Sequence, residues 1–161
     1  MNGKTVTPSG QPAEVLLDIQ QLQTTFFTHV GPVQAVRQVD LKVERGEAVG
    51  IVGESGCGKS VMSMSIMGLV TNPGKIVGGQ INFNGQDLAK IAEKDLRKIR
   101  GNKIAMIFQD PMTSLNPVKK IGGQITEVLH LHQEISHEDA KARAIELLRL
   151  VGIPTPENRL K

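Results

Sequence analysis

The chain has 161 residues, of which 39% are hydrophobic; this allows one domain with a sizeable core, and no apolar run approaches the roughly 20 residues of a membrane-spanning helix. The net charge of +3 permits contact with nucleic acid, but the aromatic side chains that a single-strand binder would need are almost absent, so we expect no nucleic-acid partner. The four histidines lack the spacing of a zinc site, and a single cysteine, Cys57, excludes an internal disulfide and favours a reducing compartment.

The first part of the chain predicts a tail followed by short strands. Residues 1–14 are polar, contain two prolines and have no helical period, so we expect a flexible tail. Apolar runs then predict strands at residues 15–19, 33–36 and 39–43, with turns at residues 31–32 and 44–47. Together these segments predict an antiparallel β layer.

The most informative stretch has the sequence GESGCGKS and matches the phosphate-binding pattern G-x-x-x-x-G-K-[ST]. An apolar run at residues 48–52, typical of a strand inside a parallel sheet, precedes it, and a helix is expected from Lys59 to about Leu69. Such a loop directs backbone N–H groups and the helix dipole at phosphates, so the sequence predicts ATP or GTP binding. The expected nucleotide contacts in the loop are Gly53, Glu54, Ser55, Gly56, Cys57, Gly58, Lys59 and Ser60.

Two side chains of this loop have predicted roles. Lys59 would reach the β- and γ-phosphates, and the Ser60 hydroxyl would ligate Mg²⁺. The alternative is a glycine-rich turn without a ligand, but such a turn would not need Lys and Ser at these positions. Cys57 lies near the helix N-terminus, which could make it reactive, although a small residue tolerated at a variable loop position is the simpler interpretation.

Strands and helices continue downstream of the loop. A break at residues 71–74 precedes a strand at 79–83, which enters a turn at Asn84-Gly85. A charged helix at residues 93–100 and a strand at 103–108 follow, and that strand ends at Gln109-Asp110-Pro111. We therefore expect a nucleotide-binding core with its β layer over residues 15–110.

From residue 111 onward the composition favours helices. Residues Ile121, Ile125, Val128 and Leu129 share one helical face. Ser136 to Asp139 is similar to a capping box, and the helix that begins there is expected to end at Gly152 and Pro154. These helices predict part of a helical subdomain over residues 111–161.

Taken together, the strands before the loop, the loop itself and residues 105–117 (AMIFQDPMTSLNP) closely resemble the ATP-binding subunits of ABC transporters. Residues 31–36 (GPVQAV) and the FQDPMTSLNP run resemble the dipeptide and oligopeptide importers most. The resemblance covers about residues 15–161 and implies an α/β fold, a P-loop NTPase of the ABC type with an N-terminal antiparallel β layer. A GTPase is disfavoured because no Asn-Lys-x-Asp run occurs, and a kinase because no arginine-rich lid follows.

The resemblance also implies roles for residues outside the loop. Gln109 would be the Q-loop glutamine, which contacts Mg²⁺ and the attacking water and would be catalytic together with Lys59; a cap at the end of a strand is the alternative. Phe26 would stack on adenine, with Phe27 as a second candidate, and a core role for either ring remains open.

By the same resemblance the cofactors are ATP and Mg²⁺. The implied partners are transmembrane permease subunits, a second ATP-binding subunit and, indirectly, a substrate-binding protein. The implied location is the cytoplasmic side of the inner membrane, reached through those subunits. The sequence does not define which substrate is transported.

Three elements that the resemblance implies do not occur in the 161 residues: a Leu-Ser-Gly-Gly-Gln signature, an apolar strand ending in Asp-Glu, and a switch histidine. The run from Ile121 to Gln124 echoes the signature but comes too soon after Gln109. Without the acidic pair, Mg²⁺ lacks a ligand contact and water lacks a general base. We therefore expect an incomplete domain with weak nucleotide binding and little turnover. The alternatives to an importer subunit are a truncated nucleotide-binding module and another P-loop NTPase.

Overall fold

The computed structural model describes residues 14–110 and 114–160. The predicted tail therefore lies outside the described residues, except for Glu14. The chain divides into two compact units between Leu96 and Arg97. The predicted boundary at residue 110 stays a prediction. Within the described ranges, no helix has the length and apolar character needed to cross a bilayer.

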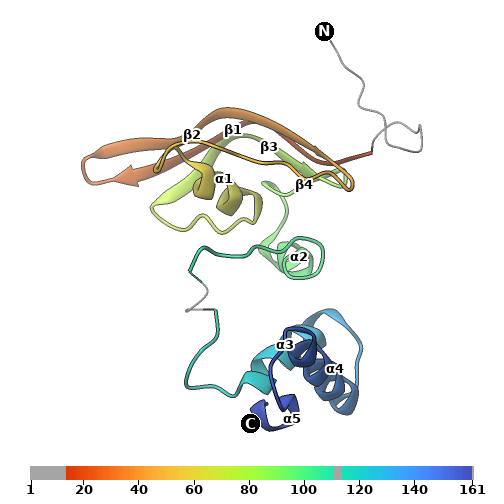
Figure 1. Cartoon of the computed structure of the whole chain (residues 1–161). Helices are drawn as coiled ribbons and strands as arrows, with labels where there is room; N and C mark the ends of the chain where they lie inside the picture. Colours follow the sequence, from red (N-terminus) through yellow and green to blue (C-terminus); the bar gives the residue numbers. More distant parts are fainter. Residues whose placement is uncertain (1–13, 111–113, 161) are drawn as a thin grey trace. The chain divides into compact units, whose positions relative to one another are not determined.

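The first unit is built on an antiparallel sheet of four strands, which confirms the predicted antiparallel β layer and adds strands from beyond the loop (Figure 1). β1 (Val15–Thr28) pairs with β2 (Gly31–Glu44) on one side and with β3 (Gly74–Phe83) on the other, and the short β4 (Gln86–Asp87) extends β3. The predicted turn at Asn84-Gly85 is confirmed, and both residues have the positive φ that a tight hairpin requires, 52° and 80°. The sequence was wrong to divide β2 into two strands.

β2 is one continuous strand because its interruption is a bulge, and bulges bend strands without ending them. The strand register shifts around Gln21 of β1 and around Gln38 of β2, whose φ angles are 50° and 49°. A matching irregularity in β3 includes Gly79, with φ 88°. The Asp40 carboxylate accepts hydrogen bonds from the backbone N–H and the side-chain amide of Gln21, at 2.6 and 2.7 Å. A polar residue inside β2 thus stabilises the bulge of the neighbouring strand.

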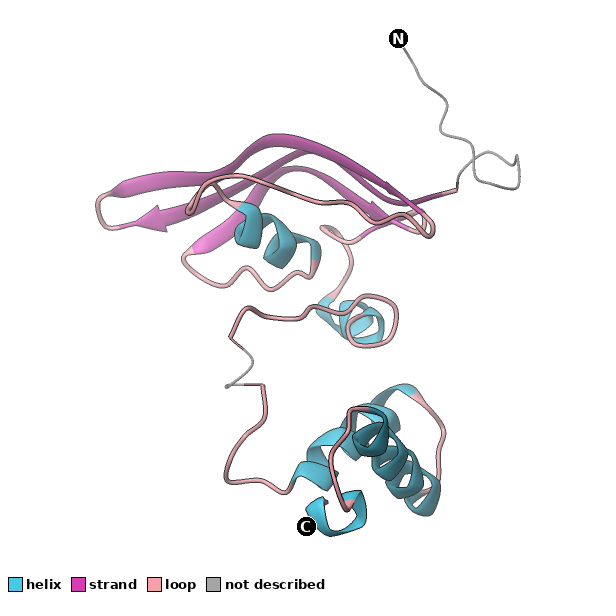
Figure 2. Ribbon diagram, in the orientation of Figure 1, coloured by secondary structure: helices cyan, strands magenta, loops and turns pink. Residues whose placement is uncertain are grey.

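Helix α1 (Lys59–Ile66) packs against one face of this sheet (Figure 2). Between them lies a buried hydroxyl pair: Thr24 Oγ1 of β1 and Ser65 Oγ of α1 are 2.9 Å apart. Because Ser65 donates its one proton to the Val61 carbonyl at 2.7 Å, Thr24 is the donor to Ser65. Around this pair the strands bury Ile19, Leu22 and Ile81 completely. The helix is therefore fixed to the sheet by packing and by a satisfied polar contact.

Two predicted strands are absent. Residues 48–52 are irregular, and residues 103–108 form only the isolated bridge between Arg100 and Ile104. A strand needs a hydrogen-bonded neighbour, and no described segment pairs with either run. Their apolar side chains are accordingly uncovered, with Val52 93% and Ile107 96% exposed. Both runs have the composition of buried strands without the sheet that would bury them.

The remaining elements of the described residues are helices. The elements are α2 (Glu93–Ile99), α3 (Ile121–His132), α4 (His137–Leu150) and α5 (Pro156–Arg159). The capping prediction is confirmed, because Ser136 Oγ accepts a hydrogen bond from the Asp139 backbone N–H at 3.1 Å. Ala140 and Ala144 of α4 are completely buried. α3 meets the C-terminal turn closely, since the Gly122 N–H donates to the Leu160 carbonyl at 3.2 Å.

Substitution of Gly79 tests the bulge in β3. A Cβ at Gly79 would lie 2.5 Å from the Gln21 carbonyl oxygen, whereas a Cβ at Gly85 meets nothing within 4 Å, although both residues have positive φ. We expect Gly85→Ala to cost about 1–2 kcal/mol of unfolding free energy from the left-handed backbone alone. Gly79→Ala should cost a further 1–3 kcal/mol or so from the clash. Urea unfolding monitored by circular dichroism measures both, and equal losses would contradict the proposed close approach.

Removal of the α4 cap provides a second test. Ser136→Ala deletes the acceptor for the Asp139 N–H, so we expect a loss of about 1 kcal/mol in the unfolding free energy. Ser136→Asn keeps a capping oxygen and should stay near the wild-type value. Thermal or urea unfolding of the three proteins is the measurement, and equal stability of Ser136→Ala and Ser136→Asn would show that the cap contributes nothing.

Candidate functional site

The last two residues of the predicted phosphate loop, Lys59 and Ser60, are the first two of α1, so the backbone N–H groups of the loop lie at the positive end of a helix. The Lys59 ammonium group folds back over the loop. Its Nζ donates to the carbonyl oxygens of Gly53 and Glu54, both at 2.7 Å, and lies 3.3 Å from Cys57 Sγ. The loop thus surrounds a half-buried positive charge, which is the arrangement that an anion-binding loop needs.

Glycine at position 58 is what brings the loop against the sheet. Gly58 has φ 94°, and a Cβ built on it would lie 2.3 Å from the Ala35 carbonyl oxygen of β2. Any other residue would meet that backbone oxygen, which cannot move without disturbing the strand. Gly56, with φ 82°, supplies a second left-handed turn. The glycine pattern of the motif therefore has two functions here, to curve the loop and to dock it on β2.

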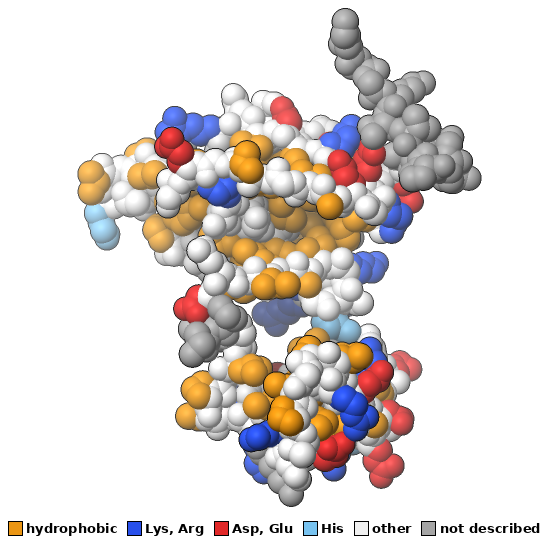
Figure 3. Space-filling view, viewed as in Figure 1, with side chains coloured by type: hydrophobic (Ala, Val, Ile, Leu, Met, Phe, Trp, Pro, Cys, Tyr) orange, Lys and Arg blue, Asp and Glu red, His pale blue; other side chains and the backbone are white. Residues whose placement is uncertain are grey.

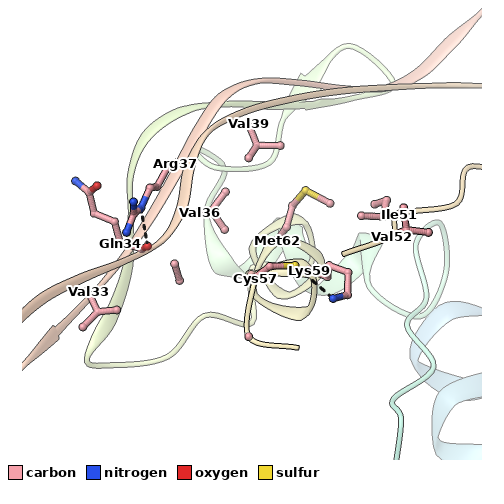
Figure 4. Close-up of a pocket in the computed structure, with 13 residues that line it drawn as sticks. Val33, Gln34, Val36, Arg37, Val39, Ile51, Val52, Cys57, Lys59 and Met62 are labelled. Atoms are coloured by element: carbon pink, nitrogen blue, oxygen red, sulfur yellow. Dashed lines mark hydrogen bonds between the residues drawn. The ribbon is translucent and has the colours of Figure 1, made fainter. Parts of the chain in front are cut away.

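Docking of the loop leaves an open cavity of about 600 Å³ between the loop, the start of α1 and β2 (Figure 4). Its charged lining residues are Arg37 of β2 and Lys59, and no carboxylate lines it. The rest of its wall is largely apolar, and hydrophobic side chains gather on this side of the sheet in the space-filling view (Figure 3). The other lining residues are Val33, Gln34, Ala35, Val36, Val39, Ile51, Val52, Gly56, Cys57, Gly58 and Met62. A positively charged cavity with apolar walls suits an anion that carries an apolar group.

Ser60 has the chemistry expected of a magnesium ligand. It is exposed, and its hydroxyl makes no hydrogen bond with any residue that the structure describes. A free hydroxyl oxygen next to a phosphate-binding loop is a hard ligand of the kind that Mg²⁺ prefers. The residues present therefore fit the ion.

Two site residues were predicted outside the loop, Phe26 and Gln109. The ring of Phe26 and the side chain of Val70 flank Gly74, where a Cβ would come within 2.7 and 2.8 Å of them, and Phe26 does not line the cavity. Phe27 is 51% exposed. Gln109 is exposed in the irregular segment of the second unit. Of the eight loop residues, Gly56, Cys57, Gly58 and Lys59 line the cavity, and Gly53, Glu54, Ser55 and Ser60 do not. The roles of Phe26 and Gln109 stay predictions.

Sequence reasoning missed the contribution of β2. Residues Ala35, Val36 and Arg37 form one wall of the cavity, yet none belongs to a nucleotide-binding pattern. The segment indicated a strand and, through residues 31–36, a resemblance to peptide importers, but no contact with a nucleotide. Neither the bulge at Gln38 nor the contact with Gly58 has a signal in the local sequence.

Comparison with known proteins agrees with this geometry. Residues 36–161 match the ABC transporter family. The oligopeptide transport ATP-binding protein OppD of Bacillus subtilis (strain 168) is 54% identical over 146 residues, which are 90% of this chain and 41% of that protein. The dipeptide transport ATP-binding protein DppD of Escherichia coli (strain K12) is 49% identical over 145 residues, 90% of this chain and 44% of that protein. The chain thus spans less than half the length of these relatives.

Solved structures show the same fold. The dimeric structure of MJ0796, a bacterial ABC transporter cassette, superposes with a TM-score of 0.71 at 26% identity, over 84% of this chain and 56% of that one. MJ0796 in a post-hydrolysis state bound to ADP and Pi gives a TM-score of 0.75 at 25% identity, over 91% of this chain and 63% of that one. The predicted fold class is confirmed, and the chain belongs to the ABC transporter family of ATP-binding proteins.

Proposed function

We propose that this chain binds ATP through residues 53–60 and contributes to an ATP-driven importer of dipeptides or oligopeptides. The observation that carries the proposal is the loop itself, which holds the Lys59 ammonium group at the N-terminus of α1 beside a cavity without carboxylates. On arrival of ATP, the phosphates replace the Gly53 and Glu54 carbonyls as acceptors for Lys59. The loop N–H groups supply further donors.

Mg²⁺ bound with ATP would neutralise charge on the phosphates and polarise them. Ser60 supplies a hydroxyl ligand from the first turn of α1. Gln109, with an amide oxygen, is the second proposed ligand and also orients the attacking water. Lys59 stabilises the negative charge that develops on the phosphates. These assignments give Lys59 and Gln109 the catalytic roles and Phe26 the role of stacking on adenine.

The role in transport is proposed from the relatives, which are named for oligopeptide and dipeptide transport. In that role the chain would act with transmembrane permease subunits and a second ATP-binding subunit, and indirectly with a substrate-binding protein. It would lie on the cytoplasmic side of the inner membrane through those partners. The identity of about 50% over nine-tenths of the chain supports this assignment.

A second candidate function is nucleotide binding without turnover by these 161 residues. It is favoured by the cavity lining, which offers two cations and no carboxylate to act as a general base for water. Turnover that disappears in Lys59→Ala would reject this candidate, whereas turnover that persists in Lys59→Ala would indicate a contaminating ATPase.

Lys59→Ala is the direct test of the binding loop. It removes a charged donor from the phosphates, so we expect the affinity for Mg-ATP, measured by isothermal titration calorimetry, to fall by roughly 10- to 100-fold. Lys75→Ala is the matched control, because Lys75 is an exposed lysine of β3 that does not line the cavity. It should bind like the wild type. Equal affinity of the Lys59→Ala and wild-type proteins would refute binding at this loop.

Chemical modification of Cys57 gives an independent test. Its thiol is exposed within the loop, so a bulky maleimide on it should block ATP binding by occupying the space of the phosphates. Cys57→Ser should bind ATP normally and should not respond to the reagent. Inhibition of Cys57→Ser by the reagent, or unimpaired binding by the modified wild type, would place the phosphates elsewhere.

A further inference from the structure

Arg37 is the one cationic side chain of the cavity that no motif explains. It comes from β2 and lines the cavity together with the phosphate loop. In Figure 4, Arg37 and Lys59 lie toward different ends of the cavity, with Val36, Met62 and Cys57 between them. An elongated ligand whose phosphates contact Lys59 would therefore extend over apolar side chains toward Arg37.

The edge strand β2 forms this wall. The consecutive residues from Val33 to Arg37, together with Val39, all line the cavity, so the cavity runs along the free edge of the strand. The strand thus presents an apolar surface and a guanidinium group to the same space. Val36 is almost completely buried within that surface.

The guanidinium group of Arg37 is free to bind a ligand. Within the described part of the chain it has no carboxylate partner, and its hydrogen bond is from Nε to the Gln34 carbonyl oxygen at 3.3 Å. That bond does not use the two terminal nitrogens, which have no hydrogen-bond partner among the described residues. Other arginines of the structure are used differently: Arg45, Arg143 and Arg149 are paired with Glu14, Glu146 and Glu157. Arg37 is thus exposed to the cavity with no competing acid.

We infer that the Arg37 guanidinium stacks on one face of the base of the bound nucleotide and so recognises the end of the ligand opposite to the phosphates. The Phe26 ring, which comes from β1 and does not line the cavity, is the proposed contact of the other face. The inference rests on the proposed function, in which residues 53–60 bind the phosphates. A nucleoside triphosphate carries its charge at one end and a flat aromatic ring at the other, which matches a cavity with Lys59 at one end and a planar cation above apolar walls at the other. Stacking of guanidinium on a base requires only a π face, so the contact accepts both adenine and guanine.

The test compares two ligands on the full chain by isothermal titration calorimetry in the presence of Mg²⁺. ATP carries phosphates and a base, whereas tripolyphosphate carries the phosphates alone. We expect Arg37→Ala to weaken ATP binding by about 3- to 10-fold and to leave tripolyphosphate binding unchanged. Lys59→Ala should weaken both ligands. Arg143→Ala, an exposed arginine of α4, is the matched control and should change neither.

Other results of this binding comparison would overturn either the inference about Arg37 or the proposed function. Equal loss of ATP and tripolyphosphate affinity in Arg37→Ala would place Arg37 on the phosphates and overturn the inference, as would no loss of either. Arg37→Lys keeps the charge but not the planar group, so full recovery of ATP affinity in that variant would also overturn stacking. A wild-type chain that binds neither ligand would refute the proposed function, and the inference with it. Circular dichroism of each variant verifies that the fold is retained.

Discussion

The approach of the Gly58 backbone to the Ala35 carbonyl oxygen is the contact on which the site depends. It joins the phosphate loop to the edge strand of the sheet, and the start of α1 with Lys59 follows directly from it. The buried hydrogen bond between Thr24 of β1 and Ser65 fixes the same helix to the neighbouring strand. Because Gly58 contacts β2 and Ser65 of α1 contacts β1, the sheet sets the position of the loop, and the loop sequence alone does not. The cavity beside β2 is a consequence of that docking.

The sequence predicted those features that are encoded by neighbouring residues. The glycine pattern, Lys59 and Ser60 identified the loop, because backbone conformation and donor chemistry are local properties. The Asn84-Gly85 turn and the Ser136 cap were likewise found, since each depends on two to four adjacent residues. Resemblance to a family predicted the fold and favoured an ABC-type ATPase over other P-loop proteins. It did so through the combination of the loop with two flanking segments, not through the loop alone.

Features that depend on residues far apart in the sequence were either missed or wrongly predicted. Residues 48–52 have the composition of a central strand, but strand formation requires a neighbour at hydrogen-bonding distance, and none is present among the described residues. The interruption expected within β2 proved to be a bulge at Gln38, and the nearby Asp40 carboxylate of β2 stabilises the bulge of the adjacent strand β1. Arg37, next to the β2 bulge, lines the cavity. None of these relations has a signature in a window of a few residues.

The matched bulges of the sheet also constrain how the chain can change in length. Irregularities occur in β1, β2 and β3 at Gln21, Gln38 and Gly79, and each shift in one strand compensates a shift in its neighbour. An insertion or deletion inside any one strand would displace the side chains beyond it to the opposite face. The hairpin turns at residues 29–30 and 84–85 carry no such coupling. Changes in chain length are therefore compatible with the fold in the turns, whereas the three strands must retain their lengths together.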